Sequence, residues 1–335
     1  MKRHGLVGAR PSKNYELPYV LSKLLPLFSD LLGRPFGLSA FRLMTARAPI
    51  TIEPPEPAIL REAAVRALGE DRGPADITTL ACVKFDTQAR ARIFAKEACT
   101  LAGLPVAELV LREQDPGLVL TARAQDGTTL NVGDTVLEIS GAASSILTAE
   151  RCALNFLQQL SGVATQTRRF VDAVTGTKCK ILDTRKTIPG LRALQKYAVR
   201  CGGGVNHRFG LYDRFLIKDN HLALMESGDR LAEAVRAARA LDAEAVLEVE
   251  VDRIDQIPDI LALGVDMLLL DNMSLDEMRA AVALIGGRVP TEASGNMTLG
   301  RVHDVAGTGV DYISVGALTH TVRSIDFSLE ILPLA

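Results

Sequence analysis

Two adjacent cations, Arg185 and Lys186, stand in the stretch ILDTRKTIPG (residues 181–190), where the apolar pair Ile181–Leu182 gives way to polar residues. A guanidinium can bind a carboxylate or a phosphate through two parallel hydrogen bonds, and a neighbouring ammonium adds a point charge. An Arg-Lys pair after a strand is more often a solvated loop, so it gains meaning only from the residues that surround it. The pair suggests an anion site at the end of a buried strand.

Apolar runs that end in polar residues recur through the second half of the chain. They are KCKILDT, RFLIKDN, AVLEVEV, DMLLLDN, RVPTEASGN and DYISVGA, and helical patterns such as LAEAVRAARAL and SLDEMRAAVALIG separate most of them. Strands that alternate with helices predict a parallel sheet, and near-continuous apolar strands predict burial on both faces. Six or more such units favour a TIM-like α/β barrel, with a doubly wound sheet as the alternative.

The carboxyl ends of barrel strands converge on one rim, and that rim carries the active site. We therefore expect the polar residues near these strand ends to line one bowl. The candidate residues are Thr184, Arg185, Lys186, His207, Arg208, Lys218, Glu250, Asp271, Ser294, Gly295, Asn296, Ser314, Val315 and Gly316.

The charges in this set fall into two groups along the chain. Cations dominate from Arg185 to Lys218, and two carboxylates follow at Glu250 and Asp271. A cationic wall that faces paired carboxylates suits an anionic substrate together with Mg²⁺, which prefers carboxylate, water and substrate oxygens. Glu248 lies on the same strand face as Glu250, and the sequence leaves open which of the two reaches the metal. The turns EASGN and SVGA lie after the late strands, where barrels place phosphate sites.

The first half of the chain has a different pattern. Residues 58–71 show helical spacing, and residues 79–140 show short alternating runs punctuated by glycine, which predicts a helix packed on a small antiparallel sheet. Residues 144–174 predict a long helix, broken or bent near Ser161–Gly162.

The composition excludes several classes of protein. With 335 residues, 47% hydrophobic and 23% charged, the chain is globular and long enough for two domains. A net charge of −2 gives no electrostatic case for nucleic acid as a partner, and no run reaches the roughly 18 apolar residues that span a bilayer. The five cysteines are scattered and form no CxxC pair, so we expect neither zinc nor disulfides and predict a reducing compartment, the cytoplasm.

The N-terminal segment is unusually basic. Residues 1–43 hold seven Lys or Arg against two acidic residues, and four prolines interrupt any long amphipathic helix. We expect residues 1–51 to be an extension outside the fold, with Met44 as an alternative start.

Several stretches together resemble the quinolinate phosphoribosyltransferase family. The resemblance runs from about residue 56 to the C-terminus, and its most specific block is residues 181–221. The stretches are AERCALNFLQQLSGVAT, ILDTRKTIPGLRALQKYAVRCGGGVNHRFGLYDRFLIKDNH, LEVEVD, LLDNM, EASGN and DYISVGALTH. It implies an α/β protein: an N-terminal α/β sandwich (52–151, joined by 318–335) plus an open seven-stranded TIM-like α/β barrel (152–317).

The resemblance also implies an activity and residue roles. Phosphoribosyl pyrophosphate and quinolinate would give nicotinate mononucleotide, CO₂ and pyrophosphate in NAD biosynthesis, with Mg²⁺ as cofactor. Lys186, Lys218, Glu250 and Asp271 would form the catalytic set. Arg185, Lys186, His207 and Arg208, beside Thr184, would hold quinolinate; Lys186 and Lys218 would contact phosphoribosyl pyrophosphate; Glu250 and Asp271 would bind its ribose and Mg²⁺; and the turns 294–296 and 314–316 would bind its 5′-phosphate. Arg151 would reach the neighbouring subunit's site in a homodimer.

Three other readings compete with this one. A strand-end lysine such as Lys218 could be the nucleophile of a Schiff-base aldolase, which would need no metal. A related phosphoribosyltransferase that does not decarboxylate would use the same scaffold. A non-catalytic anion-binding protein would explain the cations but leave Glu250 and Asp271 without a role.

Overall fold

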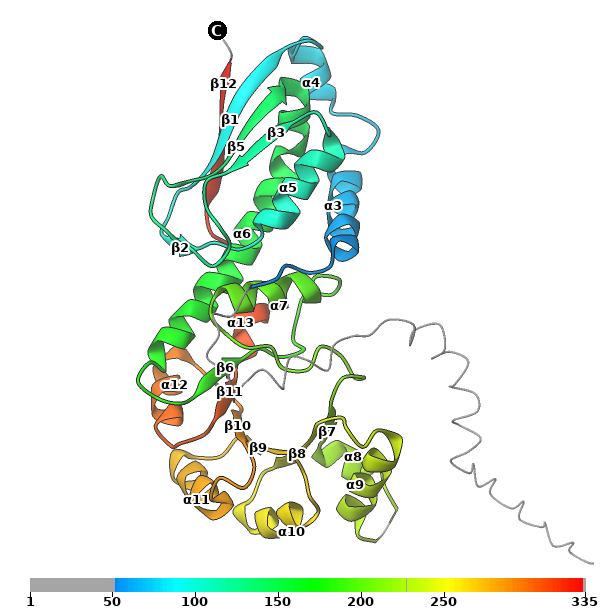
Figure 1. Cartoon of the computed structure of the whole chain (residues 1–335), viewed down its shortest axis with the longest axis vertical. Coiled ribbons are helices and arrows are strands. Elements are labelled where there is room, and N and C mark those ends of the chain that lie inside the picture. The colour runs from blue at the N-terminus through cyan, green and yellow to red at the C-terminus, as the bar shows by residue number, and fades with distance from the viewer. Residues whose placement is uncertain (1–51, 227, 334–335) are drawn as a thin grey trace, which may run out of the picture. The chain divides into compact units, whose positions relative to one another are not determined.

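Two hydrophobic cores organise residues 52–226 and 228–333, the part of the chain that the computed structural model describes (Figure 1). One core lies under an antiparallel sheet, and the other lies between a parallel sheet and the helices that cover it. The predicted extension, residues 1–51, lies outside the described residues, as do residues 334 and 335 of the predicted C-terminal segment.

The antiparallel sheet has the strand order β12-β1-β5-β3, and each neighbouring pair in it is antiparallel. Residues 89, 91, 93 and 95 of β1 are buried, while Arg90 and Arg92 between them are exposed. This alternation is what a sheet with one covered face requires. The last strand, β12, pairs with β1, so the end of the described chain completes the first sheet. The strands are β1 (Gln88–Ala95), β3 (Val119–Ala122), β5 (Thr135–Ala142) and β12 (Phe327–Pro333).

Helix α3 (Pro57–Arg72) confirms the helix predicted at residues 58–71. The prediction for residues 79–140 was wrong in part, because it contained only strands. A helix, α5 (Leu104–Gln114), lies among them, and α4 (Ile77–Cys82) overlaps the start of the stretch. The signal for α5 was Gly103 followed by Pro105 at the first turn, with buried Val106 and Val110 one turn apart. A second, two-stranded sheet pairs β2 (Cys99–Thr100) with β4 (Thr129–Leu130).

Helix α6 (Ala143–Ala173) links the two cores without interruption. Of the two predicted alternatives near Ser161–Gly162, a break or a bend, the break is therefore wrong. A Cβ at Gly162 would lie 2.5 Å from the carbonyl oxygen of Arg323, so this position needs glycine for a close backbone approach. Residues of α6 up to Leu157 pack in the first core, and residues from Leu160 onward pack in the second. Among the described residues, neither α6 nor any other helix is long and apolar enough to cross a membrane.

The second sheet confirms an α/β architecture with parallel strands. Its order is β6-β11-β10-β9-β8-β7, and every pair is parallel. The six strands correspond to the six predicted runs: β6 (Lys180–Leu182), β7 (Phe215–Ile217), β8 (Leu247–Val251), β9 (Met267–Asp271), β10 (Thr291–Ser294) and β11 (Tyr312–Ser314). Beyond these named strands, Val205 makes one isolated parallel bridge to Leu182 at the β6 edge.

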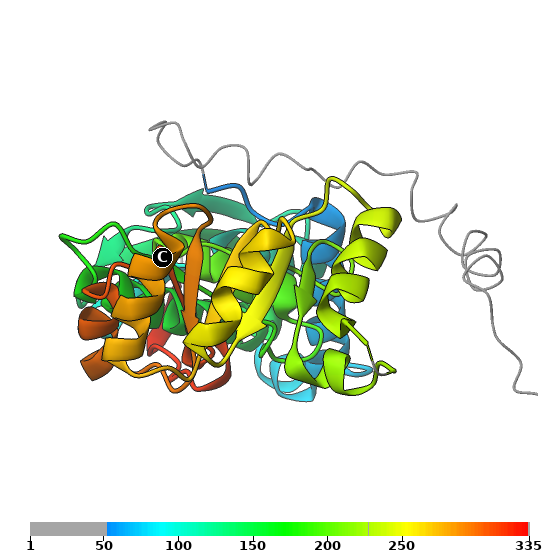
Figure 2. The ribbon, with the colours of Figure 1, turned by 90° about the horizontal axis from the view of Figure 1, so that it is seen from below.

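Helices connect the parallel strands, and α9 and α11 confirm the two helical patterns predicted between them. Seen from below, α9 to α12, coloured yellow-green to orange, lie side by side across the near face (Figure 2). The helices of this half are α7 (Arg192–Cys201), α8 (Asp219–Ala223), α9 (Arg230–Leu241), the 3₁₀ turn η2 (Ile254–Gln256), α10 (Ile257–Ala262), α11 (Leu275–Ile285), α12 (Leu299–Ala306) and α13 (Ala317–His320).

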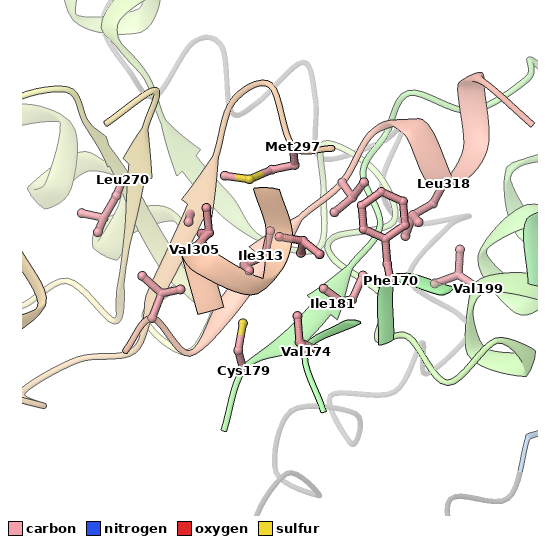
Figure 3. Packing of buried hydrophobic residues seen from close by; sticks show 14 of the residues in the cluster. Phe170, Val174, Cys179, Ile181, Val199, Leu270, Met297, Val305, Ile313 and Leu318 are labelled. Atoms are coloured by element: carbon pink, nitrogen blue, oxygen red, sulfur yellow. The ribbon is translucent and has the colours of Figure 1, made fainter. Parts of the chain in front are cut away.

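The two faces of the parallel sheet differ in chemistry. Alternate residues, among them Ile181, Leu270 and Ile313, belong to one hydrophobic core that also contains Phe170 of α6 (Figure 3). The residues between them point to the other face, which carries Glu248, Glu250, Asp271, Glu292, Ser294 and Ser314. Burial of the strands on both faces is therefore confirmed, although one of the two faces also holds buried charge.

Candidate active site

The strand register brings the predicted rim residues together at the carboxyl end of the parallel sheet. Ser294 lies opposite Asp271, Ser314 lies opposite Leu182, and Thr184 follows two residues after Leu182. Each of these residues stands at or just beyond the carboxyl end of its strand. Side chains separated by as many as 130 residues in sequence thus share one edge, as a barrel rim requires.

Lys218 and Glu250 form an ion pair at this edge. Ile217 pairs with Val249, so the next residues along β7 and β8 face each other, and Lys218 Nζ donates to Glu250 Oε2. The lysine side chain is 38% exposed and the glutamate side chain is 12% exposed. The Lys218 ammonium is therefore partly exposed at the rim, while the Glu250 carboxylate beside it is mostly covered.

His207 lies in a buried charge cluster beneath the rim. Its Nε2 is 3.2 Å from Glu248 Oε2 and 3.3 Å from Glu292 Oε2, and Arg214 Nη1 is 3.4 Å from the same Glu248 oxygen. The backbone N–H of Arg208 donates to His207 Nδ1 at 2.6 Å. Both ring nitrogens of His207 thus already have neighbours within the protein, and the side chain does not stand open on the rim.

The pKa values in this cluster follow from burial and from its ion pairs. Burial alone would lower the pKa of His207, but the Glu292 and Glu248 carboxylates outweigh it and raise that pKa to about 9. Burial opposes ionisation of Glu248 as well, yet His207 and Arg214 hold the pKa of Glu248 below its usual value. Burial and the charge of Glu248 raise the pKa of Glu292. Negative charge is thus concentrated on Glu248.

Two sets of side chains offer metal-ligand chemistry. The buried set is His207, Glu248 and Glu292, whose ligand atoms lie within 4.8 Å of one another. The Arg214 guanidinium already supplies positive charge to that set. The predicted set, Glu250 and Asp271, lies nearer the rim on the same face of adjacent strands, because Glu250 pairs with Leu269, two residues before Asp271. Carboxylates spaced in this way fit Mg²⁺, which needs only one or two from the protein.

Asp183 is the centre of a second buried network. Its carboxylate accepts hydrogen bonds from Lys196 Nζ, from Asn206 Nδ2 at 2.5 Å and from the backbone N–H of His207 at 2.9 Å. Burial raises the pKa of Asp183 and lowers the pKa of Lys196, and their mutual attraction opposes both shifts. The network fastens the residues before Arg208 to the end of β6.

Arg185 and Arg208 place two guanidiniums at the rim, near enough for the charge of Arg185 to act on Arg208. Arg185 Nε is buried and has no hydrogen-bond partner among the described residues. The pKa of Arg208 is lowered, first by burial and next by the positive charge of Arg185. A buried N–H group without a partner and repulsion between two cations are both relieved by a bound anion. The surroundings of Arg185 and Arg208 therefore suit a bound anion.

Lys186 connects this region to the last strand-end turn. A Cβ at Gly316 would lie 3.0 Å from Lys186 Cδ, so the lysine stem passes directly over that glycine. Thr319 of α13 also donates its hydroxyl to the carbonyl of Lys186 at 2.7 Å. The other predicted phosphate turn has Gly295 at φ 99° and Asn296 at φ 49°. Left-handed backbone in such a turn leaves N–H groups free to face an anion.

Models of one family match most of the described chain. The model described as quinolinate phosphoribosyl transferase, N-terminal domain, matches residues 76–161, and that for the C-terminal domain matches residues 163–330. A carboxylating nicotinate-nucleotide pyrophosphorylase of Mycobacterium leprae is 48% identical over 277 residues, covering 81% of this chain and 96% of its own. The chain belongs to the quinolinate phosphoribosyltransferase family.

Other members of the family support this membership. A probable carboxylating nicotinate-nucleotide pyrophosphorylase of Bacillus subtilis is 41% identical over 263 residues, covering 78% of this chain and 90% of its own. The solved structure of the nicotinate-nucleotide pyrophosphorylase from Francisella tularensis has a TM-score of 0.78 at 40% identity, and the match covers 82% of this chain and 96% of that one.

One residue that the family resemblance assigned to the site lies elsewhere in the described chain. Arg151 is on the part of α6 that packs in the first core, and its side chain is 58% exposed. Its ion-pair partner is the adjacent Glu150, at 3.8 Å. Burial raises the pKa of that Glu150 carboxyl, and Arg151 opposes the shift.

The sequence analysis missed three buried charged residues beneath the candidate site. Glu292 and Arg214 were not singled out, and neither was Lys196. Glu292 lies two residues before Ser294 and so shares its face of β10, which was a usable signal. Lys196 lies in helix α7, where nothing in the sequence indicates that it turns inward.

Two hollows lie away from this edge. One, of about 480 Å³, is on the outer face of the antiparallel sheet and includes Arg90 and Glu138. The other, of about 410 Å³, lies between α3 and α6 and includes Asp71 and Cys152. Burial raises the pKa of the Cys152 thiol to about 11, and the five cysteines of the described chain are all free. Neither hollow is lined by the rim residues.

Proposed function

We propose that this chain transfers the phosphoribosyl group of phosphoribosyl pyrophosphate to quinolinate, with decarboxylation, in NAD biosynthesis. The products are nicotinate mononucleotide, CO₂ and pyrophosphate. The observation that carries the proposal is the neighbouring guanidiniums of Arg185 and Arg208, one with a buried N–H that lacks a protein partner. A ring with two adjacent carboxylates offers one anionic group to each guanidinium.

The quinolinate side of the site comprises Thr184, Arg185, Lys186, His207 and Arg208. Each charge-assisted hydrogen bond contributes roughly 1.5–3 kcal/mol, so a few of them suffice for a small dianion. His207 would reach a carboxylate by turning from its buried partners, or would act from below by supporting Arg208, whose backbone N–H it accepts.

The phosphoribosyl pyrophosphate side comprises Lys186, Lys218, Glu250 and Asp271, together with two turns. Residues 294–296 and 314–316 would bind the 5′-phosphate, and the lysine stem over Gly316 supports this placement. Glu250 and Asp271 would bind the ribose and hold Mg²⁺, and Glu248 is the less suitable ligand because it is fully buried beneath the rim between His207 and Arg214. When bound, Mg²⁺ supplies positive charge to the pyrophosphate oxygens.

The reaction has two stages on this arrangement. The pyridine nitrogen of quinolinate attacks C1 of the ribose, and the bond to pyrophosphate breaks with its electron pair, through an oxocarbenium-like state. Lys186 and Lys218 stabilise the charge that develops on the leaving group. The ring nitrogen is then cationic, so the ring can keep the electron pair at C2 when that carboxylate leaves as CO₂, and a proton takes its place. Arg185 and Arg208 orient the ring throughout.

Several parts of the architecture belong to this proposal. The single bridge at Val205 supports a seventh strand position beside β6, which would make the sheet an open seven-stranded barrel. The presence of two cores supports two domains, which we place at residues 52–151 with 318–335 and at residues 152–317. The free cysteines support a reducing compartment, and we place the enzyme in the cytoplasm.

A homodimer is also part of the proposal. Arg151 projects from the sandwich half with only Glu150 as its ion-pair partner within the described chain, which suits a role in a neighbouring subunit's site. An Arg151→Ala variant should lose activity while remaining dimeric by light scattering. Activity equal to the parent's would contradict this role.

A Schiff-base aldolase is less well supported. Its nucleophilic lysine needs a free neutral amine, whereas Lys218 Nζ is engaged by the Glu250 carboxylate. A phosphoribosyltransferase that does not decarboxylate remains the second candidate, because one carboxylate would satisfy one guanidinium. The paired guanidiniums favour the dicarboxylate.

Release of CO₂ tests the proposed function directly. Quinolinate labelled in its C2 carboxylate should release labelled CO₂ only when phosphoribosyl pyrophosphate and Mg²⁺ are both present. Turnover of nicotinate without CO₂ release would favour the second candidate, and borohydride trapping of Lys218 with a carbonyl substrate would favour the aldolase.

Kinetics of an Arg185→Ala variant test the site assignment. The KM for quinolinate should rise far more than the KM for phosphoribosyl pyrophosphate, because the guanidinium is assigned to quinolinate alone. Equal effects on both constants would contradict the assignment.

A further inference from the structure

Helix α7 carries two cations one turn apart that connect the two segments of the quinolinate side. Arg192 and Lys196 are four residues apart, so they lie on the same face of the helix. One segment, residues 183–187, carries Arg185; the other, residues 206–209, carries Arg208. Neither α7 side chain has a role in the function proposed above.

Lys196 joins the segments at their buried ends. Its Nζ donates to the Asp183 carboxylate on one side and to the carbonyl of His207, at 3.0 Å, on the other. Asn206 completes this set of hydrogen bonds, because its Nδ2 donates to the carbonyl of Lys196 at 2.9 Å as well as to Asp183. The lysine is only 3% exposed, so these bonds are shielded from water.

Arg192 joins the same two segments nearer the surface. Its Nη2 donates to the carbonyl of Arg185 at 3.4 Å, and its Nη1 donates to the carbonyl of Phe209 at 3.1 Å. Its Nε donates to the Thr187 hydroxyl at 3.0 Å. Arg192 and Lys196 therefore make two separate links between the segments, one helical turn apart along α7.

We propose that Arg192 and Lys196 are positioning residues that fix the separation of Arg185 from Arg208, and that this separation makes the site select a ligand with two carboxylates over a ligand with one. The inference rests on the proposed function, because it assigns both guanidiniums to one dicarboxylate.

The physical reason is the repulsion between the two guanidiniums. Like charges that are close together and partly buried push their segments apart unless the backbone is held. Arg192 donates to a carbonyl in each segment, and Lys196 donates to the Asp183 carboxylate and the His207 carbonyl. The backbone held in this way fixes the positions from which the side chains of Arg185 and Arg208 extend. A ligand with two carboxylates needs both guanidiniums at the right spacing, whereas a ligand with one carboxylate needs a single guanidinium and tolerates a change in spacing.

The test compares two unreactive probes by calorimetry. Phthalate has two adjacent carboxylates on a ring and benzoate has one, and neither has a ring nitrogen that could attack the ribose. In an Arg192→Met variant, the Kd of phthalate should rise about tenfold or more, while that of benzoate should change less than about threefold. Arg192→Lys, which keeps a donor, should recover part of the selectivity.

The matched control is Arg279→Met, which removes an arginine from an exposed ion pair on α11 and should leave both affinities as in the parent. Thermal melting checks that each variant is folded. Should Arg192→Met fail to fold, Thr187→Val removes the hydroxyl that Arg192 bonds and should lower the selectivity in the same direction.

Three outcomes overturn the inference. Equal loss of phthalate and benzoate binding would show a general structural role, and unchanged selectivity would show that Arg192 does not set the spacing. Equal binding of the two probes by the parent protein would overturn it too. Failure of the proposed function is distinguishable, since it would appear as absent CO₂ release by the parent protein, independently of these binding ratios.

Discussion

The two sheets of this protein place their charges in opposite ways. On the antiparallel sheet, the pairs Arg92–Glu330 and Arg123–Glu138 lie on the open face with side chains about half exposed. On the parallel sheet, Glu248 and Glu292 lie inside, at most 1% exposed. Both sheets alternate apolar and polar residues, yet only one of them directs its polar residues inward.

The difference shows what each charge contributes. An exposed ion pair is solvated in both the folded and the unfolded chain, so it adds little to stability. A buried pair loses its hydration, and it persists only when partners compensate that loss. The buried charges of the parallel sheet therefore add little net stability, because they lose their hydration. Their position beneath the rim suits a role in holding the site's cations.

The largest effect is expected from removing a buried carboxylate. Asp183→Ala leaves the buried ammonium of Lys196 with the His207 carbonyl as its remaining acceptor, and it removes the acceptor of the His207 backbone N–H and one of the two acceptors of the Asn206 amide. The free energy of unfolding should fall by about 3–5 kcal/mol, measured by urea denaturation. Asp183→Asn, which keeps an acceptor, is the control and should lose less. If Asp183→Ala lowered the free energy of unfolding by less than removal of an exposed ion pair does, the contrast between the two sheets would be lost.

A smaller effect is expected from titrating His207. Its folded pKa of about 9 lies above the unfolded value, so protonated His207 stabilises the fold below about pH 6.5, and this contribution is lost as the pH rises to 9. Each unit of pKa difference corresponds to about 1.4 kcal/mol. The parent protein should lose a few kcal/mol of stability over this window relative to His207→Gln. If the free energies of unfolding of the two proteins changed with pH in the same way, His207 would not hold a proton in the folded protein.

The helix that joins the two regions should respond to a single methyl group. Gly162→Ala places a Cβ against the carbonyl of Arg323 and should destabilise the protein by about 1–3 kcal/mol in thermal unfolding. The control is Gly69→Ala in α3, where a Cβ would meet nothing within 4 Å. That change should stabilise the protein by about 0.5–1 kcal/mol, because alanine favours helix. Equal effects of the two substitutions on thermal unfolding would mean that the backbone near Arg323 can move to admit the methyl group.

The smallest effect is expected on the open face of the antiparallel sheet. Arg123→Met with Glu138→Gln removes an exposed ion pair, and the melting temperature should change by no more than about 1 °C. A large drop would mean that exposed pairs stabilise the antiparallel sheet more than their solvation allows.

The parallel strands and the rim could be predicted from the sequence because both depend on local order along the chain. Residues such as Lys218 and Asp271 follow directly after apolar runs, and a strand that ends places its next side chain at the sheet edge. The helix α5 was missed because its apolar spacing stood between runs that alternate as strands do. The break at Gly162 was predicted wrongly because glycine weakens a helix locally, whereas here it permits contact with residues 322 and 323, far along the chain.

The amino-acid sequence by itself determined the six parallel strands and their order along the chain, the cations of the 181–221 block and the carboxylates that end the later strands. Strand tendency and apolar periodicity are properties of neighbouring residues, so they can be read without a fold. Only the tertiary structure decided that Glu292 faces His207, that Lys196 turns inward to Asp183, and that Arg185 has a buried N–H group without a partner. Those facts depend on strand register and helix packing, which bring together residues that the chain keeps far apart.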